Sequence, residues 1–170
     1  MDLNKYLRDV PDFPKPGILF KDITPLLASP PAMIEAIARL ARLEVGRVDK
    51  VAAIESRGFL FGVPLAMKLG VGFVPIRKPG KLPWKTNRVE YVLEYGRDAV
   101  EIHQDGVRKG ERVLLIDDLL ATGGTMGAAC RLIETCGGLV AACAVVVELA
   151  FLPGRTRLAP HRVESLVAIP

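Results

Sequence analysis

Residues 116–125 read "IDDLLATGGT", in which two neighbouring acids, Asp117 and Asp118, lead into a loop rich in glycine and threonine. Carboxylates accept hydrogen bonds from hydroxyl groups, as the acidic residue of a dinucleotide site does for a ribose. Glycines let backbone N–H groups converge on an anion, and the start of a following helix adds unpaired N–H groups and a favourable dipole. The stretch therefore predicts a sugar-phosphate site, with the sugar hydroxyls at the acids and the phosphate ester in the loop.

Two common phosphate motifs do not fit this loop. No lysine follows the glycines, as a Walker A loop requires, and Gly123, Gly124 and Gly127 lack the G-x-G-x-x-G spacing. The alternative interpretation is an acidic strand end followed by an ordinary helix cap, which requires the acid pair, the glycines and their order to coincide by chance. Carboxylates beside the sugar would also stabilise positive charge that develops at its C1 atom.

Two strand–helix units are expected to position the loop. Apolar strands are predicted at residues 51–56, 73–76, 113–116, 139–147 and 163–169. Apolar residues recur at helical spacing after the first and third of these strands, with Gly70 and Gly137 as stops, and the second helix is expected to begin near Thr125. This alternation favours an α/β fold with a mostly parallel sheet covered on both faces. Ligands of such sheets bind beyond the carboxyl ends of the strands, where Asp117 and Asp118 would lie.

Two regions depart from this strand–helix alternation. Residues 2–9 are predicted as a short helix before a proline-rich loop, and Pro30 and Pro31 open a second helical pattern. Residues 77–103 hold a basic stretch rich in Pro and Gly, then two strands around Gly96, Arg97 and Asp98, which predict a hairpin. Excursions of this length are usually functional or disordered, and composition alone leaves both possibilities open.

Bulk composition bounds the class of protein. A chain of 170 residues with a net charge of +4 fits one domain with a sizeable core. The sequence has no basic run with interleaved aromatic residues, which argues against a nucleic-acid partner, and no apolar run long enough to span a bilayer, which argues against a membrane. Cys130, Cys136 and Cys143 are odd in number and form no C-x-x-C pair, so we interpret them as core residues of a reduced, cytoplasmic protein.

The stretch at 116–125 resembles the motif by which type I phosphoribosyltransferases bind 5-phosphoribosyl 1-diphosphate (PRPP). Further segments are similar to members of that family that act on adenine, at residues 13–27, 55–62, 77–83, 93–96 and 145–149. The resemblance spans nearly the whole chain. It implies a single domain over residues 1–170, with a central mostly parallel sheet flanked by helices, a small hood from about residues 1–30 and a mobile hairpin loop at about residues 78–100.

The resemblance also implies an activity, which is transfer of the phosphoribosyl group from PRPP to adenine to give AMP and diphosphate in purine salvage. Mg²⁺ is the implied cofactor, held mainly through PRPP and water with no direct protein ligand. The implied assembly is a homodimer.

Residues of this chain acquire roles from the resemblance. Asp117 and Asp118 match the acids on the ribose hydroxyls. The residues that match the 5-phosphate cradle are Ala121, Thr122, Gly123, Gly124 and Thr125. Arg57 matches an arginine that faces the diphosphate, after a Glu55–Ser56 peptide that the family holds in the cis form.

The basic loop and the hairpin hold the remaining residues on the diphosphate side and the catalytic acid. Lys78 and Lys81 match residues that approach the diphosphate, with Arg77 as support, and an alternative for Lys78 is that it reaches across a dimer interface. Glu94 and Tyr95 match the family's catalytic pair, in which the acid exchanges a proton with the N7 side of the purine. Arg57 completes the implied catalytic set.

Three residues match positions that contact adenine. Leu19 would read the amino edge through its backbone, Lys21 would lie beside it, and Leu149 would contact the ring face. Many members carry arginine where this chain has Lys21, and lysine lacks the bidentate fork of a guanidinium.

Two other functions remain open from the sequence. The nearer one is a sister transferase that acts on a 6-oxo purine, which base preference would distinguish. The second is a regulator that senses PRPP without catalysis; such regulators carry an additional DNA-binding domain, whereas here the strand–helix core begins by about residue 50 and the segment before it matches the adenine site. The presence of Glu94 also argues for chemistry.

Overall fold

The computed structural model describes residues 1–92 and 96–170, and the chain forms two compact units, Met1–Arg42 and Leu43–Pro170. Each unit is built around its own set of elements. Glu94 and Tyr95 lie outside the described residues.

The unit Met1–Arg42 begins with a 3-10 helix, η1 (Leu3–Tyr6), and strands β1 (Arg8–Val10) and β2 (Phe20–Asp22), followed by helices α1 (Thr24–Leu27) and α2 (Pro30–Ala41). The prediction of a helix over residues 2–9 is wrong beyond residue 6. β1 instead pairs antiparallel with β2, and Arg8 Nη2 lies 2.6 Å from Asp22 Oδ2 of its register partner. Strand pairing with a segment distant in sequence therefore takes the backbone groups that a longer helix would have used.

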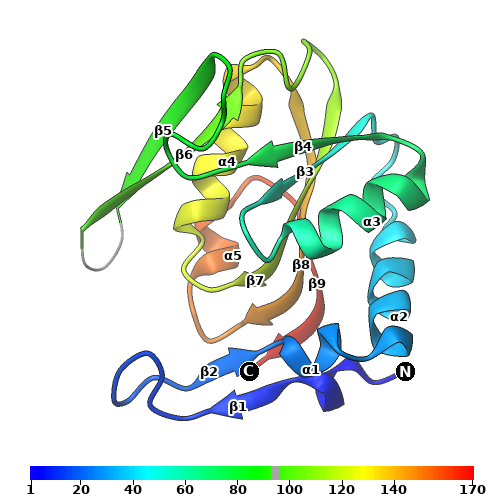
Figure 1. Ribbon diagram of the computed structural model, residues 1–170, viewed down its shortest axis with the longest axis vertical. Coiled ribbons are helices and arrows are strands. Elements are labelled where there is room, and N and C mark those ends of the chain that lie inside the picture. The colour runs from blue at the N-terminus through cyan, green and yellow to red at the C-terminus, as the bar shows by residue number, and fades with distance from the viewer. Residues whose placement is uncertain (93–95) are drawn as a thin grey trace. The chain divides into compact units, whose positions relative to one another are not determined.

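The unit Leu43–Pro170 is an α/β structure around a five-stranded, wholly parallel sheet in the order β4-β3-β7-β8-β9 (Figure 1). Its elements are β3 (Lys50–Ile54), α3 (Phe59–Leu69), β4 (Gly72–Ile76), β5 (Thr86–Val92), β6 (Arg97–His103), β7 (Arg112–Leu120), α4 (Gly124–Thr135), β8 (Leu139–Leu149), α5 (Gly154–Arg157) and β9 (Val163–Ile169). The predicted α/β class and parallel sheet are confirmed.

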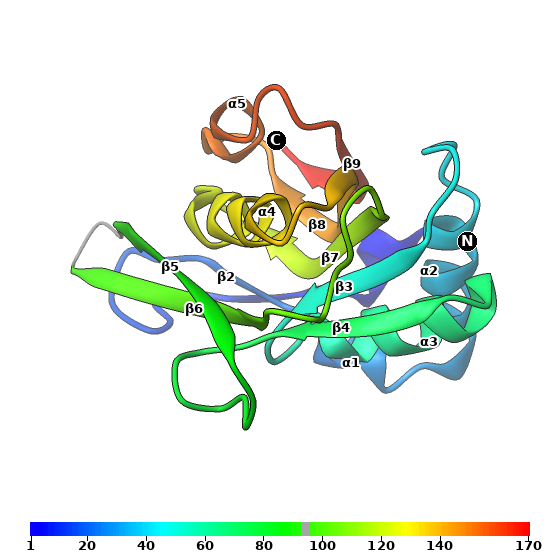
Figure 2. The ribbon, with the colours of Figure 1, turned by 90° about the horizontal axis from the view of Figure 1, so that it is seen from above.

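Helices cover both faces of this sheet, with α3 on one side and α4 on the other (Figure 2). Alternate residues of a strand point to opposite faces. In β3, Ala52 and Ile54 belong to the core under α4, whereas Ala53 lies against Gly62 of α3. Because both faces are buried, the strands are continuous apolar runs, which is why they can be recognised in the sequence.

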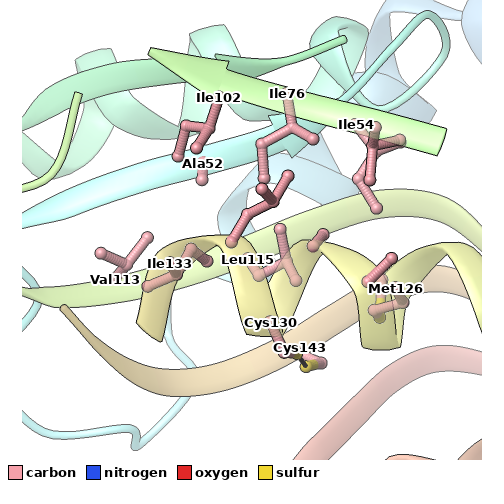
Figure 3. Packing of buried hydrophobic residues seen from close by; sticks show 14 of the residues in the cluster. Ala52, Ile54, Ile76, Ile102, Val113, Leu115, Met126, Cys130, Ile133 and Cys143 are labelled. Carbon is pink, nitrogen blue, oxygen red and sulfur yellow. Dashed lines mark hydrogen bonds between the residues drawn. The ribbon is translucent and has the colours of Figure 1, made fainter. Parts of the chain in front are cut away.

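The core between the sheet and α4 is formed by apolar side chains at helical spacing (Figure 3). Met126, Cys130 and Ile133 of α4 are buried against the sheet, and Cys130 Sγ lies 3.4 Å from Cys143 Sγ of β8. The thiol of Cys130 and burial together raise the pKa of Cys143, so Cys143 remains an uncharged thiol. The interpretation of these cysteines as core residues is confirmed, and Cys136 is half-buried and also free.

The excursion at 77–103 forms an antiparallel hairpin that packs against α4. β5 and β6 pair from Thr86 opposite His103 to Val92 opposite Arg97. Arg97 and Asp98, predicted in the turn, already belong to β6. A bridge between Arg77 and Glu101 joins the end of β4 to β6, so the hairpin is anchored to the parallel sheet.

No helix in the described parts of the chain is both long and apolar enough to cross a bilayer.

Candidate active site

The acid pair lies within strand β7 and not after it. The prediction that the strand ends at Ile116 is wrong, because the ladder with β8 continues until Leu120 pairs with Glu148. Successive residues of a strand start towards opposite faces, but the two carboxylates remain close enough to interact, and the backbone N–H of Asp118 donates to Asp117 Oδ1 at 2.9 Å. Asp117 lines the pocket at the start of α4, whereas Asp118 forms an ion pair with Arg57, with 2.9 Å between Oδ2 and Nε.

The Gly-Thr loop and the first turn of α4 form a pocket of about 110 Å³, lined by Asp117 and residues 119–126. All five predicted cradle residues therefore line one pocket together with one of the two predicted acids. α4 begins at Gly124, one residue before the predicted start, and no described side chain caps it. The first N–H groups of a helix have no partner within the helix, so this end can bind an anion.

Close backbone packing shapes the loop from behind. Gly123 has a φ of +82°, and a Cβ atom there would lie 2.8 Å from the carbonyl oxygen of Gly154, the first residue of α5. The next residue, Arg155, forms a bidentate pair with Glu148 of β8 through Nε at 2.8 Å and Nη2 at 2.6 Å. Ser165 Oγ donates to the same carboxylate at 2.7 Å. The sequence did not predict that Glu148, Arg155 and Ser165 support the loop, although an acid within the apolar run "VVVEL" was a signal.

The two adjacent carboxylates are electrostatically unfavourable without a ligand. Burial and the neighbouring charge of Asp118 raise the pKa of Asp117 well above its usual value. Burial also raises the pKa of Asp118, and the charge of Arg57 opposes that rise. Asp118 Oδ2 is buried and ion-paired with Arg57, and it accepts no hydrogen bond from the residues that the structure describes.

The turn between β3 and α3 brings Arg57 beside the acids. The Glu55–Ser56 peptide in this turn is cis, as the resemblance implies. A Cβ atom on Gly58 would lie 2.5 Å from the Ile54 carbonyl oxygen and 3.0 Å from Asp117 Oδ1. Only glycine therefore lets the turn approach β7 closely enough for Arg57 to reach Asp118.

The cations of the basic loop form ion pairs with acidic side chains. Glu55 accepts from Arg77 Nε at 2.6 Å and from Lys81 Nζ at 2.7 Å. Burial raises the pKa of Glu55, but the hydrogen bonds from Lys81 and Arg77 outweigh it and leave the pKa below its usual value. Lys78 is paired with Asp98 of β6. The ion pair with Arg57 and those with Glu55 connect the turn to β7 and to the basic loop.

The predicted adenine residues belong to different units. Leu149 is the last residue of β8, whereas Leu19 and Lys21 lie in the unit Met1–Arg42. In that unit Leu19 is exposed, and Lys21 Nζ lies 2.5 Å from Asp9 Oδ1 of β1. The predicted catalytic residues Glu94 and Tyr95 fall outside the described residues.

Comparison with known proteins agrees with this geometry. A profile described as the phosphoribosyl transferase domain matches residues 26–161. The adenine phosphoribosyltransferase of Chloroflexus aurantiacus is 58% identical over 167 residues, which cover 98% of this chain and 96% of the relative.

Solved structures are similar as well. The adenine phosphoribosyltransferase of Thermoanaerobacter pseudethanolicus superposes with a TM-score of 0.95 at 52% identity, over 98% of each chain. That of Saccharomyces cerevisiae, complexed with adenine and an imino-altritol bisphosphate, superposes with a TM-score of 0.92 at 40% identity, over 96% of each chain.

Proposed function

Because the chain belongs to the phosphoribosyltransferase family, we propose that it transfers the 5-phosphoribosyl group of PRPP to adenine, with AMP and diphosphate as products. The observation that carries this proposal is the pocket in which Asp117 and the loop of residues 119–126 line one cavity at the start of α4. One sugar phosphate can bind both parts of this pocket, with its hydroxyls at the acid and its phosphate at the backbone amides.

Each part of the pocket has a role in this reaction. The amides at the start of α4 and the hydroxyls of Thr122 and Thr125 would bind the 5-phosphate. Asp117 and Asp118 would accept hydrogen bonds from the ribose hydroxyls, and the place of Asp117 in the pocket lining supports this role. Their negative charge would also stabilise the positive charge that develops at C1 as the diphosphate leaves.

The leaving group would be received by the cations around the β3–α3 turn. Arg57 already lies beside Asp118, and Glu55 already orients Arg77 and Lys81. An ordered cation costs less entropy at binding than a free side chain. The diphosphate would therefore meet preorganised guanidinium and ammonium groups, with Lys78 nearby in its pair with Asp98.

Mg²⁺ is part of the proposal as a substrate-borne cation that neutralises the diphosphate. Among the described residues, no group of three His, Cys, Asp or Glu side chains could hold a metal ion. The ion would be held mainly by PRPP oxygens and water, because Mg²⁺ keeps several waters and binds substrate phosphates. The acids of the pocket would then serve the sugar.

The proton of the purine is assigned to Glu94, with Tyr95 beside it, on the resemblance of "LEYG". Adenine would be read by the backbone at Leu19, next to Lys21, and by Leu149 on its ring face. A backbone C=O accepts from the 6-amino group, whereas a 6-oxo purine would place acceptor against acceptor. The unpaired group costs about 1–3 kcal/mol, or roughly tenfold to a hundredfold in discrimination.

The testing experiment is turnover with PRPP and Mg²⁺ and each purine base in turn. We expect nucleotide formation with adenine and at least roughly tenfold less with hypoxanthine, guanine or xanthine. Preference for a 6-oxo purine would assign the chain to a sister transferase. DNA binding that follows PRPP concentration without turnover would instead identify a regulator.

We also propose a cytoplasmic homodimer in which residues 1–170 act as one functional domain, with a hood from about residues 1–30 and a loop at about 78–100 over the site. Leu60, Val63 and Met67 form an exposed apolar stripe on α3, at helical spacing, which supports a partner surface. Light scattering on the purified chain should give twice the chain mass of 18.4 kDa. A monomer that still turns over adenine would contradict the dimer alone.

A further inference from the structure

The phenol of Tyr91 connects the hairpin, the basic loop and the proposed phosphate cradle. Tyr91 is only 6% exposed and belongs to β5, a strand that lies beside α4 (Figure 1). Its hydroxyl accepts from Lys78 Nζ at 3.0 Å and from Thr125 Oγ1 at 3.1 Å, and donates to Asp98 Oδ2 at 3.0 Å. A phenol has one proton and two acceptor positions, so all of its hydrogen-bonding capacity is used.

The cradle motif does not explain these contacts, because only one of the three partners of Tyr91 belongs to it. Thr125 lines the pocket, whereas Lys78 and Asp98 come from the basic loop and from β6. Lys78 Nζ also lies 5.6 Å from the centre of the Tyr91 ring, which favours a cation at that place. One side chain therefore fixes a cradle hydroxyl and a basic-loop ammonium relative to each other.

The Thr125 hydroxyl cannot donate to Tyr91 and to a bound phosphate at the same time. A threonine hydroxyl carries one proton, and here that proton is donated to Tyr91. A bound phosphate monoester can only accept at its anionic oxygens, so Thr125 must turn its proton towards the phosphate. The oxygen of Thr125 is then free to accept, and the Tyr91 hydroxyl is the donor already in contact with it.

We propose that Tyr91 is a positioning residue for the transfer reaction, which turns its own proton from Asp98 to Thr125 when phosphate fills the cradle and keeps Lys78 beside it. No bond other than hydrogen bonds is made or broken, and the proton stays on the phenol oxygen. A donor behind Thr125 strengthens the hydrogen bond from Thr125 to the phosphate, because hydrogen bonds in a chain polarise one another. The inference rests on the proposed function of the cradle.

A double-mutant cycle on ribose 5-phosphate binding tests this role. Tyr91→Phe keeps the ring and removes the hydroxyl, and Thr125→Val removes the group through which Tyr91 acts. We expect Tyr91→Phe to weaken binding about five- to tenfold in the wild-type background, as a lost hydrogen bond does. In the Thr125→Val background the same change should have less than a twofold effect. Calorimetry on the purified enzyme measures all four dissociation constants.

Two further variants serve as controls. Asp98→Asn keeps an acceptor for Tyr91 and removes the charge that faces Lys78, so ribose 5-phosphate should bind within twofold of wild type. Thr125→Ser keeps the hydroxyl and should restore the sensitivity to Tyr91→Phe. A purely structural role predicts the opposite pattern, in which Tyr91→Phe weakens binding equally with Thr125 present or absent, and that result would overturn the proposal.

The outcomes separate this inference from the proposed function. Wild-type enzyme that turns over adenine, with a Tyr91→Phe variant that binds ribose 5-phosphate normally, overturns the role of Tyr91 alone. Wild-type enzyme that neither binds ribose 5-phosphate nor turns over adenine overturns both. If Tyr91→Phe does not fold, near-UV difference absorbance in a Tyr6→Phe, Trp84→Phe, Tyr95→Phe background reports the single remaining tyrosine without a tryptophan. We expect ribose 5-phosphate to perturb that absorbance, and an unchanged spectrum would contradict the turned proton.

Discussion

Arg155 forms a bidentate pair with Glu148, and the two side chains differ in exposure: that of Arg155 is 52% exposed, whereas that of Glu148 is 6% exposed. The pair fixes α5 to the end of β8, and the first residue of α5, Gly154, packs against Gly123 in the proposed phosphate loop. A contact behind the loop therefore holds the back of the proposed cradle in place. The hydrogen bonds from Arg155 lower the pKa of Glu148 despite burial, so the acid is ionised and needs its partner.

Arg155→Met should therefore destabilise the fold and weaken PRPP binding. Glu148 would keep only the Ser165 hydroxyl, at a cost of about 1–3 kcal/mol. The matched control is Arg88→Met, since Arg88 is 51% exposed but pairs with a Glu90 side chain that is 57% exposed. Such a surface pair is worth only about 0–1 kcal/mol. Urea unfolding of both variants makes the comparison, and equal losses would show that the Glu148 pair gives no particular support.

Gly123→Ala should damage the cradle itself. The left-handed conformation at this position costs about 1–2 kcal/mol for a residue with a Cβ atom, and the new atom would also press on the Gly154 carbonyl. We expect lower stability and at least roughly tenfold weaker ribose 5-phosphate binding, equivalent to ~1.4 kcal/mol.

The control for that substitution lies one turn further along α4. A Cβ atom on Gly127 would meet only Leu158 Cδ2 at 3.7 Å, an ordinary contact. Gly127→Ala should therefore be neutral or stabilise by about 0.5–1 kcal/mol. Equal binding losses in both variants would argue against a special role for the conformation of Gly123.

The sequence was sufficient to predict those parts of the fold that depend on local pattern. Continuous apolar runs marked the parallel strands because both faces of the sheet are buried, and Gly137 marked the end of α4 through its left-handed conformation. That the five predicted cradle residues line one pocket was also predictable, since one short loop carries them all.

What could not be predicted depends on contacts between segments far apart in the chain. β7 runs through Asp117 and Asp118 because β8 pairs with it there, although two acids interrupt the apolar pattern. Arg8 entered a strand because Asp22 lies opposite. Tyr91, Asp98 and the Glu148 pair were missed because each is an ordinary residue by type, and only the tertiary fold brings it to its partners.

The sequence resemblance makes one prediction about the catalytic acid. Glu94→Gln removes proton exchange with the purine but leaves the phosphate cradle intact. We expect kcat to fall by about 10²–10⁴-fold, the usual contribution of a general acid or base, while PRPP binding changes little. Steady-state kinetics with calorimetric PRPP binding measure the two effects, and an unchanged kcat would move the proton-transfer role to another residue.

The raised pKa of Asp117 predicts a variant that is more stable but binds its ligand less well. Burial and the charge of Asp118 raise the folded-state pKa above the unfolded value, so the folded chain binds more protons between the two. The contribution of Asp117 to the free energy of unfolding is then fully present below its unfolded-state pKa, and it is lost as the pH rises through its folded-state pKa. Asp117→Asn cannot ionise and should avoid that loss.

At neutral pH, ligand-free Asp117→Asn should therefore have a higher melting temperature than wild type, by about 2–4 °C for each kcal/mol gained in a chain of this length. In acid the two melting temperatures should converge. PRPP should raise its melting temperature less than that of wild type, because the charged acceptor for the ribose is gone. Asp118→Asn is the matched control: its carboxylate is partly compensated by Arg57, so its removal should stabilise the free enzyme less. Melting curves of all three proteins across pH give the answer, and parallel curves for wild type and Asp117→Asn would contradict a raised pKa at Asp117.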